Sequence, residues 1–270
     1  MRNVLLVTGA AGGVGSLLRP RLLRLGWRLR LLDVRPPAEP LGAGEELILA
    51  SITDVEAMTA ACAGVDAVLH LGGQSVEAPV EQVLELNMLG TYSVLEAARR
   101  VGVSRVIIAS SNHAAGFHQR GAEPVPADAP PRPDTLYGWS KVAAEAVGRL
   151  YHDRFGMDVI CLRIGFCFET PSTLRALALW LSPDDGARLV EACLTAPSPG
   201  YRIVWGISRN TRRWCSLAEG EAIGYHPQDD AEVYADKLIA EHGEPDFTHD
   251  PLLSRIGGQW CEIPLGVRMS

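Results

Sequence analysis

The amino-acid sequence predicts a doubly wound α/β fold, in which a parallel sheet carries helices on both faces. The first observation is that short apolar runs alternate with longer segments of helical periodicity over residues 1–165. The second is that the opening run, Val4–Thr8, is short enough to be a buried parallel strand and leads directly into a glycine-rich turn. The third is that the alternation fades after residue 165. We therefore expect a sheet domain over residues 1–165 and a small substrate-binding lobe with a C-terminal tail over residues 166–270, both integral to one fold unit.

Composition narrows the class of protein further. The chain has 270 residues, 47% of them hydrophobic, and a formal net charge of −7. A full core can form at this length, and the acidic balance disfavours nucleic acid and anionic membranes as partners. No apolar stretch reaches spanning length and the N-terminus begins on a core strand, so we expect a cytoplasmic protein. The six cysteines show no metal-ligand spacing, so we expect buried thiols in a reducing compartment and no metal site.

The turn after the first strand is the first candidate functional feature. Gly9, Gly12 and Gly15 fall three residues apart where a helix begins. In a strand-turn-helix unit, such glycines make the turn, admit a pyrophosphate close to the backbone and pack helix against strand. A plain glycine turn remains the alternative for this pattern taken alone.

A helix and a second strand follow the turn. Leucines recur at helical spacing over Ser16–Leu25, and Gly26 ends that helix. Arg28–Val34 is then a strand, and Asp33 near its end lies eighteen residues beyond Gly15. A carboxylate there accepts hydrogen bonds from ribose hydroxyls and repels a 2′-phosphate, which favours NAD over NADP. A strand-end aspartate that starts a turn is the alternative, and the neighbouring Arg35 leaves some room for NADP.

The next elements prepare a second side of the site. We expect a strand at Glu46–Ala50, a helix capped by Asp54, a strand at Val65–Leu71 and a helix at Val80–Val101. Gly72 and Gly73 follow the second of these strands and would let the backbone pass close to a cofactor. Asn87 is a polar amide in an apolar helix, which is typical of a hydrogen-bonded network and equally of an isolated satisfied core residue.

Polar side chains then gather at the carboxyl end of the fifth strand. Ser104–Ser111 runs straight into Asn112 and His113, where open α/β sheets bind ligands. After a Pro-rich loop, Tyr137 opens a helix through Phe155. Tyr137 and Lys141 are four residues apart and therefore project from one helix face. Met157–Ile164 is a sixth strand.

The last third has weaker periodicity. Leu174–Leu181, Asp184–Ala196 and Asp229–His242 look helical, and Arg202–Trp205 reads as a short strand. The tail, Gly243–Ser270, is expected either to wrap the body or to serve a subunit contact in a homo-oligomer.

Several of these motifs together resemble the extended short-chain dehydrogenase/reductase family. They are TGAAGGVG at Thr8–Gly15, Asp33, NMLGT at Asn87–Thr91, the pair Ser110–Ser111 and YGWSK at Tyr137–Lys141. Within that family, the uronate dehydrogenases are the most similar group. The runs that carry this closer resemblance are His70–Glu77, Ala109–Phe117, Arg132–Lys141, Leu162–Gly165 and Val204–Ser208.

The resemblance implies NAD-dependent oxidation of a hexuronic acid, such as glucuronate or galacturonate, at C1 to the aldarolactone. It implies Ser111, Tyr137 and Lys141 as catalytic residues, and Ser75, Ser111, Asn112, His113, Phe166 and Arg175 as substrate contacts. The implied NAD contacts are Gly9, Gly12, Gly13, Val14, Gly15, Asp33, Val34, Ser51, Ile52, Leu71, Gly72, Gly73, Asn87, Tyr137, Lys141 and Cys167.

Two positions depart from the pattern of the family. Ser51 stands where an aspartate usually holds the adenine. Phe166, directly after the run Leu162–Gly165, replaces a serine that contacts the substrate. An apolar ring there removes a hydrogen-bond donor, so the identity of the sugar acid is left open.

The residue types fit proton and hydride chemistry. Because a free tyrosine has a pKa of about 10, we expect the Lys141 ammonium and the positive nicotinamide ring to lower the pKa of Tyr137. Arg175 could bind a carboxylate through two parallel hydrogen bonds, or pair with a surface aspartate. The alternatives are an NAD-dependent dehydrogenase of another sugar or sugar phosphate, a nucleotide-sugar epimerase or dehydratase, and a non-enzymatic NAD sensor.

Overall fold

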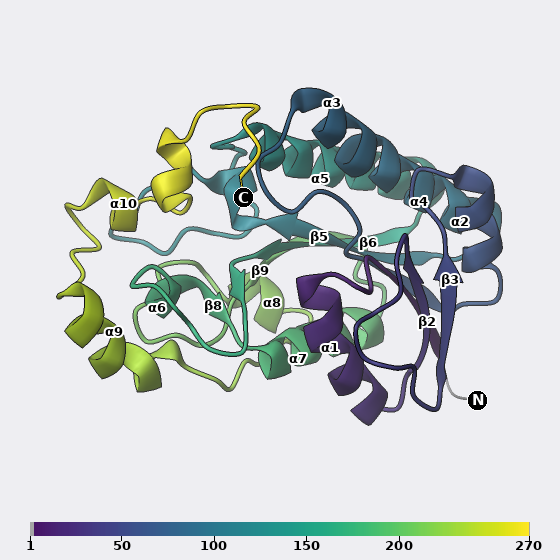
Figure 1. Cartoon of the computed structure of the whole chain (residues 1–270), viewed down its shortest axis with the longest axis horizontal. Helices are drawn as coiled ribbons and strands as arrows, with labels where there is room; N and C mark the ends of the chain where they lie inside the picture. The colour runs from purple at the N-terminus through teal and green to yellow at the C-terminus, as the bar shows by residue number, and fades with distance from the viewer. Residues whose placement is uncertain (1–2, 270) are drawn as a thin grey trace.

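A parallel sheet between two layers of helices forms the body of the molecule (Figure 1). The computed structural model describes residues 3–269. Its seven-stranded sheet has the order β3-β2-β1-β4-β5-β6-β9, and all neighbouring strands pair in parallel. The strands are β1 (Val4–Thr8), β2 (Arg28–Asp33), β3 (Glu45–Leu49), β4 (Ala67–His70), β5 (Arg105–Ser111), β6 (Asp158–Ile164) and β9 (Tyr201–Gly206). The predicted doubly wound fold is confirmed.

The helices cover both faces of the sheet. One layer holds α2 (Val55–Cys62), α4 (Gly90–Arg100) and α5 (Leu136–Phe155), and the other holds α1 (Gly13–Arg24) and α7 (Pro183–Thr195) (Figure 1). The shorter helices are α3 (Val80–Val83), α6 (Ala176–Leu179), α8 (Ala218–Glu221), α9 (Ala235–His242) and α10 (Pro251–Ser254). The 3₁₀ turns are η2 (Asn112–Ala115), η3 (Ala231–Tyr234) and η4 (Gly258–Glu262).

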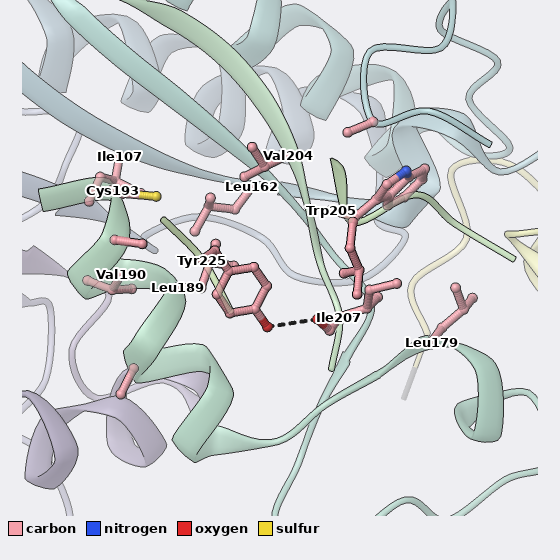
Figure 2. Close-up of a cluster of buried hydrophobic side chains, with 14 of the residues drawn as sticks. Ile107, Leu162, Leu179, Leu189, Val190, Cys193, Val204, Trp205, Ile207 and Tyr225 are labelled. Atoms are coloured by element: carbon pink, nitrogen blue, oxygen red, sulfur yellow. Dashed lines mark hydrogen bonds between the residues drawn. The ribbon is translucent and has the colours of Figure 1, made fainter. Parts of the chain in front are cut away.

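Successive side chains of a strand point to opposite faces of the sheet, so the hydrophobic core has two parts, one beneath each layer of helices. On β1, Leu5 and Val7 face the layer of α1 and α7, whereas Leu6 faces the layer of α2, α4 and α5. Figure 2 shows part of the first core, where Leu162 and Val204 of the sheet meet side chains of α7. Strands buried on both faces are largely apolar, which is why β1 and β4 at the centre of the sheet are nearly continuous apolar runs.

Local sequence signals set the ends of the principal helices. The Asp54 carboxylate accepts hydrogen bonds from the backbone of Glu56 and Ala57 and so caps α2, as predicted. The Thr135 hydroxyl caps α5 by accepting from the Gly138 N–H, and Gly156 ends that helix with φ at 69°. The predicted strands and helices up to residue 164 lie within a few residues of their expected bounds.

The expected helix Val80–Val101 contains an unexpected wide turn. It is helical from Val80 to Arg100, but the segment η1 (Leu84–Leu89) between α3 and α4 is a π-helix. Thr91 Oγ1 donates a hydrogen bond to the Asn87 carbonyl at 2.6 Å within this stretch. A π-turn inside an α-helix often marks a functional position, and Asn87 lies in it.

The last third confirms one expectation and corrects two. Arg202–Trp205, expected as a short strand, lies in β9, which extends the main sheet beside β6. Leu174–Leu181 is helical only in α6, because Trp180–Leu181 (β8) pairs with Phe166–Cys167 (β7). The expected helix Asp229–His242 begins as η3, capped by Asp230, and becomes α9 at Ala235. At Trp180–Leu181 a tertiary contact, the pairing with β7, overrides the local helical periodicity.

The described helices between residues 3 and 269 include none that combines the length and the apolar character needed to cross a bilayer.

Candidate active site

Two adjoining cavities open at the carboxyl ends of the central strands. One has a volume of about 420 Å³ and contains the glycine-rich turn and the end of β2. The other has a volume of about 370 Å³ and contains the ends of β5 and β6 and the start of α5. Gly13, Val14, Leu71, Gly73 and Ser75 line both cavities. Ligands of doubly wound sheets bind in this position, outside the strand ends where the strand order reverses.

The glycine turn packs too closely against neighbouring backbone for side chains to fit at Gly9 and Gly15. Gly9 has φ at 67°, and a Cβ there would lie 2.6 Å from the backbone nitrogen of Gly72. A Cβ on Gly15 would lie 2.6 Å from the Gly9 carbonyl oxygen. Gly12, the N-cap of α1, has no side chain to occupy the first N–H groups of the helix. The turn therefore presents free backbone donors to the larger cavity, as a pyrophosphate requires.

Asp33 lies at the end of β2 and lines this same cavity. Its Oδ2 accepts a hydrogen bond from the Ala11 N–H at 2.9 Å, and its Oδ1 accepts from the Arg35 N–H at 3.3 Å. These bonds hold the carboxylate beside the glycine turn. Val34, Ser51 and Ile52 line the same cavity at its outer end. The predicted cofactor residues of the first half therefore converge on one space.

Asn87 is the exception among the predicted cofactor contacts. Its side chain is buried and lines neither cavity. Its Oδ1 accepts from the Gln74 N–H at 2.7 Å, and its Nδ2 donates to the Gln74 carbonyl and to Ser140 Oγ. Both N–H groups of its amide and one lone pair of Oδ1 are used within the protein. Asn87 therefore braces the Gly73–Gln74 loop against α5, and its contact with the cofactor stays a prediction.

Tyr137, Lys141 and Ser111 line the smaller cavity together. Lys141 Nζ lies 5.5 Å from the centroid of the Tyr137 ring and donates a hydrogen bond to the Ala109 carbonyl at 2.8 Å. Ser111 Oγ accepts from the His113 N–H at 3.2 Å, which caps η2. The chain therefore delivers a phenol, an ammonium and a hydroxyl to one wall.

The electrostatics of this wall differ from expectation. Burial raises the pKa of Tyr137 to about 12, and the Ser111 hydroxyl opposes this shift. Burial also lowers the pKa of Lys141 to about 8, while the Glu145 carboxylate acts in the opposite direction. The predicted lowering of the Tyr137 pKa is therefore not produced by the protein alone, because desolvation of the phenolate outweighs the hydrogen bond from Ser111.

Glu77 holds the first turn of α5. Its side chain is fully buried, and its Oε2 accepts a hydrogen bond from the Tyr137 N–H at 2.9 Å. Its Oε1 accepts from the Gly266 N–H in the C-terminal tail at 2.7 Å. A carboxylate at a helix N-terminus is stabilised by the helix dipole. Glu77 thus ties the tail to the backbone of Tyr137.

Arg175 and Asn112 meet at the opposite side of the smaller cavity. The Ile256 carbonyl of the tail accepts from Arg175 Nη1 at 2.6 Å and from Asn112 Nδ2 at 3.1 Å. Burial lowers the pKa of Arg175 to about 10, against the opposing effect of Asp134, so the guanidinium stays charged at neutral pH. Within residues 3–269, no carboxylate lies at ion-pair distance from it. The predicted surface pair with an aspartate is therefore wrong.

Phe166 acquires a structural role in this wall. The Arg175 guanidinium carbon lies 4.6 Å from the centroid of the Phe166 ring, a cation–π contact. The ring supports the guanidinium from below and lines the cavity. Cys167 follows it and also lines the cavity as a buried free thiol. Phe166 therefore places a flat aromatic face against Arg175.

The sequence reasoning missed Trp260, which lies in η4 of the tail. Its ring stacks on His113 at 3.9 Å between centroids and lies 5.8 Å from the Tyr137 ring. It lines both the smaller cavity and a neighbouring cavity of about 300 Å³. The tail has no periodicity that would predict its path, so a lone tryptophan was its only signal.

The chain is similar to a known protein family and to named enzymes. Residues 5–168 match the NAD dependent epimerase/dehydratase family. The uronate dehydrogenase of Pseudomonas putida is 44% identical over 259 residues, which cover 96% of this chain and 96% of that protein.

Two solved structures are similar over almost the whole chain. The crystal structure of uronate dehydrogenase from Agrobacterium tumefaciens superimposes with a TM-score of 0.89 at 40% identity, covering 97% of this chain and 98% of that one. A tyrosine-to-alanine mutant of the enzyme from the same organism, complexed with NAD, has a TM-score of 0.90 at 39% identity and covers 98% of both chains. The similarity thus includes the C-terminal third.

Proposed function

The chain belongs to the NAD-dependent epimerase/dehydratase family, and from this premise we propose that it oxidises a hexuronic acid at C1 with NAD as oxidant. The observation that carries the proposal is the Arg175 guanidinium. It is buried and charged, has no carboxylate partner in the described chain, and lines the cavity that also holds Tyr137 and Ser111. A buried cation in such a place is stabilised by an anionic group on the substrate.

The larger cavity is the proposed site of NAD. Its glycine turn and the N-terminus of α1 would hold the pyrophosphate, and Asp33 would accept hydrogen bonds from the ribose hydroxyls. Bound NAD supplies the hydride acceptor, which the protein itself lacks. Its nicotinamide end would reach the smaller cavity, because both cavities share Gly73 and Ser75.

The proposed chemical step moves one proton at the anomeric oxygen. Tyr137, as the phenolate, takes the proton from the C1 hydroxyl and becomes the neutral phenol, and the Ser111 hydroxyl holds the same oxygen in place. Lys141 places positive charge near Tyr137, which stabilises the phenolate before the transfer. Because burial raises the pKa of Tyr137 to about 12, the step depends on positive charge beside the phenol in the loaded enzyme. The organic product is the aldarolactone.

The remaining polar groups of the smaller cavity would orient the sugar. Arg175 would bind the carboxylate, while Asn112, His113 and Ser75 would contact hydroxyl groups. Asn112 and Arg175 both donate a hydrogen bond to the Ile256 carbonyl. The side chains that would bind the carboxylate and a hydroxyl group are therefore held in place by the same backbone group. This pre-organisation favours one orientation of C1 towards Tyr137.

A substrate panel tests the proposal. We expect NADH to form with galacturonate or glucuronate, and far more slowly with galactose, glucose or their 6-phosphates. Turnover of the neutral or phosphorylated sugars with none of the uronates would refute it. The same assay with NADP is expected to give a much lower rate, because Asp33 would face the 2′-phosphate.

Residues 166–270 are proposed to act as the substrate-binding lobe, since Phe166, Arg175 and Trp260 line the smaller cavity. We also propose a homo-oligomer. Leu89, Tyr92 and Trp139 of the η1, α4 and α5 segments are large apolar side chains exposed to solvent, which favours a subunit contact. Measuring the molar mass by light scattering after size exclusion tests this oligomer.

The cysteines, all free thiols, support a reducing, cytoplasmic location.

A further inference from the structure

His113 is held by a buried carboxylate that the proposed chemistry does not use. His113 Nδ1 lies 2.7 Å from Asp134 Oδ2, and the Asp134 side chain is fully buried. The two residues come from different segments, since His113 lies in η2 after β5 and Asp134 directly precedes the N-cap of α5. An ionised carboxylate only accepts hydrogen bonds, so the nitrogen that faces it has to carry the proton.

The other oxygen of Asp134 is fixed by the cap of α5. Thr135 Oγ1 accepts a hydrogen bond from the Gly138 N–H at 2.9 Å. The same hydroxyl lies 3.0 Å from Asp134 Oδ1 and donates its single proton there. Asp134 is therefore an acceptor at both oxygens, one facing Thr135 and one facing His113.

Three glycines make space for this carboxylate. A Cβ on Gly116 or on Gly257 would lie about 2 Å from Asp134 Oδ2, and a Cβ on Gly138 would lie 3.0 Å from Oδ1. These glycines come from the end of η2, from the tail and from α5. Three distant parts of the chain thus enclose one carboxylate and hold it in a single orientation.

The second ring nitrogen of His113 faces the smaller cavity. No side chain or backbone group of residues 3–269 forms a hydrogen bond with Nε2. In the described residues, the fully buried side-chain atoms without a hydrogen-bond partner are Trp214 Nε1 and Glu219 Oε2. His113 Nε2 is not one of them, so it is open to solvent in the cavity. His113 lines the cavity, and its ring face is covered by Trp260. The stacked ring cannot turn away, so Nε2 points at the space available to a ligand.

The imidazole is neutral in this setting. Burial lowers the pKa of His113 below its usual value and the Arg175 charge adds to this, while Asp134 opposes both. The titratable ring of Tyr137 also packs against it, at 5.9 Å between centroids. A neutral imidazole has one donor nitrogen and one acceptor nitrogen.

We propose that Asp134 is a positioning residue that locks His113 in the Nδ1–H tautomer, so that Nε2 accepts a hydrogen bond from a hydroxyl group of the sugar. The assignment of the tautomer stands on the geometry of His113, Asp134 and Thr135, and the sugar hydroxyl as the partner of Nε2 rests on the proposed function.

The tautomer is tested directly by NMR on the NAD-saturated enzyme with ¹⁵N-labelled histidine. Long-range proton–nitrogen correlations distinguish the two tautomers, and His113→Gln identifies the signal by its loss. We expect a protonated Nδ1 and an unprotonated Nε2 in the wild type. A wild-type spectrum with the proton on Nε2 overturns the proposal. Because no substrate is present, this result is independent of whether uronates are turned over.

Asp134→Asn gives the sharper second test. The bond from Thr135 favours the amide oxygen on its side, which turns the amide N–H₂ towards His113 Nδ1 and moves the imidazole proton to Nε2. We expect the tautomer to invert and KM for the uronate to rise about tenfold, the effect of one hydrogen bond. KM for NAD should stay within about twofold, since His113 does not line the larger cavity. An inverted tautomer with unchanged uronate KM would overturn the role of Nε2.

The chain supplies a matched control. Asp246 Oδ2 lies 3.0 Å from His249 Nδ1 in an exposed pair of the same chemistry. Asp246→Asn should leave the His113 spectrum and the uronate KM unchanged. If Asp134→Asn does not fold, the wild-type spectrum still decides the tautomer.

Discussion

Removing the Arg175 guanidinium should abolish recognition of the substrate carboxylate while leaving the cofactor site intact. Arg175→Met keeps much of the side-chain volume but removes the charge and with it the cation–π contact with Phe166. Truncating one partner of a buried, hydrogen-bonded charge pair costs about 2–5 kcal/mol, because the other charge is left unpaired. A loss of about 3–4 kcal/mol corresponds to a fall of about 10²–10³-fold in kcat/KM.

The assay is NADH formation with galacturonate, compared with competitive inhibition by galactose, which has the same ring without the carboxylate. We expect the variant to lose uronate turnover and to bind galactose as the wild type does. Arg175→Lys should fall between the two, since it keeps the charge but not the two parallel donors. Arg209→Met, which removes an exposed arginine paired with Glu221, serves as the control.

Two outcomes would refute the reasoning. Equal losses for the uronate and for galactose would show that Arg175 shapes the cavity rather than binding a carboxylate. An unchanged KM for the uronate would place the carboxylate elsewhere. Since Arg175 Nη1 also holds the Ile256 carbonyl, the thermal unfolding midpoint of the variant is measured alongside, to separate binding from stability.

Four further outcomes follow from the site. Tyr137→Phe should reduce kcat at least about 10²-fold, the contribution of a general base, with NAD affinity by fluorescence titration unchanged; a normal rate would exclude Tyr137 as the base. Asp33→Asn should weaken the binding of NAD and reduce the preference of the enzyme for NAD over NADP. An unaltered ratio of kcat/KM for the two cofactors would contradict the assignment of Asp33 to the ribose. Phe166→Ser should change the ratio of galacturonate to glucuronate turnover, because it removes the support of Arg175; identical ratios would show that the ring has no influence. Burial lowers the pKa of Lys141 to about 8, so its charge destabilises the fold at neutral pH and this penalty is relieved as pH rises from about 8 to 10.5. Lys141→Met should thus raise stability in urea by up to about 3 kcal/mol at pH 7 and by much less at pH 10, and a gain independent of pH would refute the buried charge.

The order of elements was accessible from the sequence because it depends on local patterns. The central strands β1 and β4 are nearly continuous apolar runs, and caps such as Asp54 and Gly156 mark helix ends within a few residues. The glycine turn and Asp33 could be placed in the cofactor site for the same reason, since both stand at fixed distances from β1 and β2.

The seventh strand could not be predicted as part of the sheet. β9 follows α7 after the last predicted strand of the sheet domain, and only its pairing with β6 assigns it to the body of the fold. The π-turn around Asn87 was equally hidden, because its hydrogen bonds to Gln74 and Ser140 come from other segments. Such pairings cost chain entropy that local propensity does not report.

The sequence by itself determined the fold class, the position of the cofactor turn and the presence of Tyr137 and Lys141 on one helix face, because each depends on residues close together in the chain. Tertiary structure alone decided the surroundings of those groups. In the protein alone, burial raises the pKa of Tyr137, and the aperiodic tail brings Trp260 onto His113 and Ile256 onto Arg175. Desolvation and long-range packing depend on what the rest of the chain places around a residue, and spacing along the sequence carries no record of that.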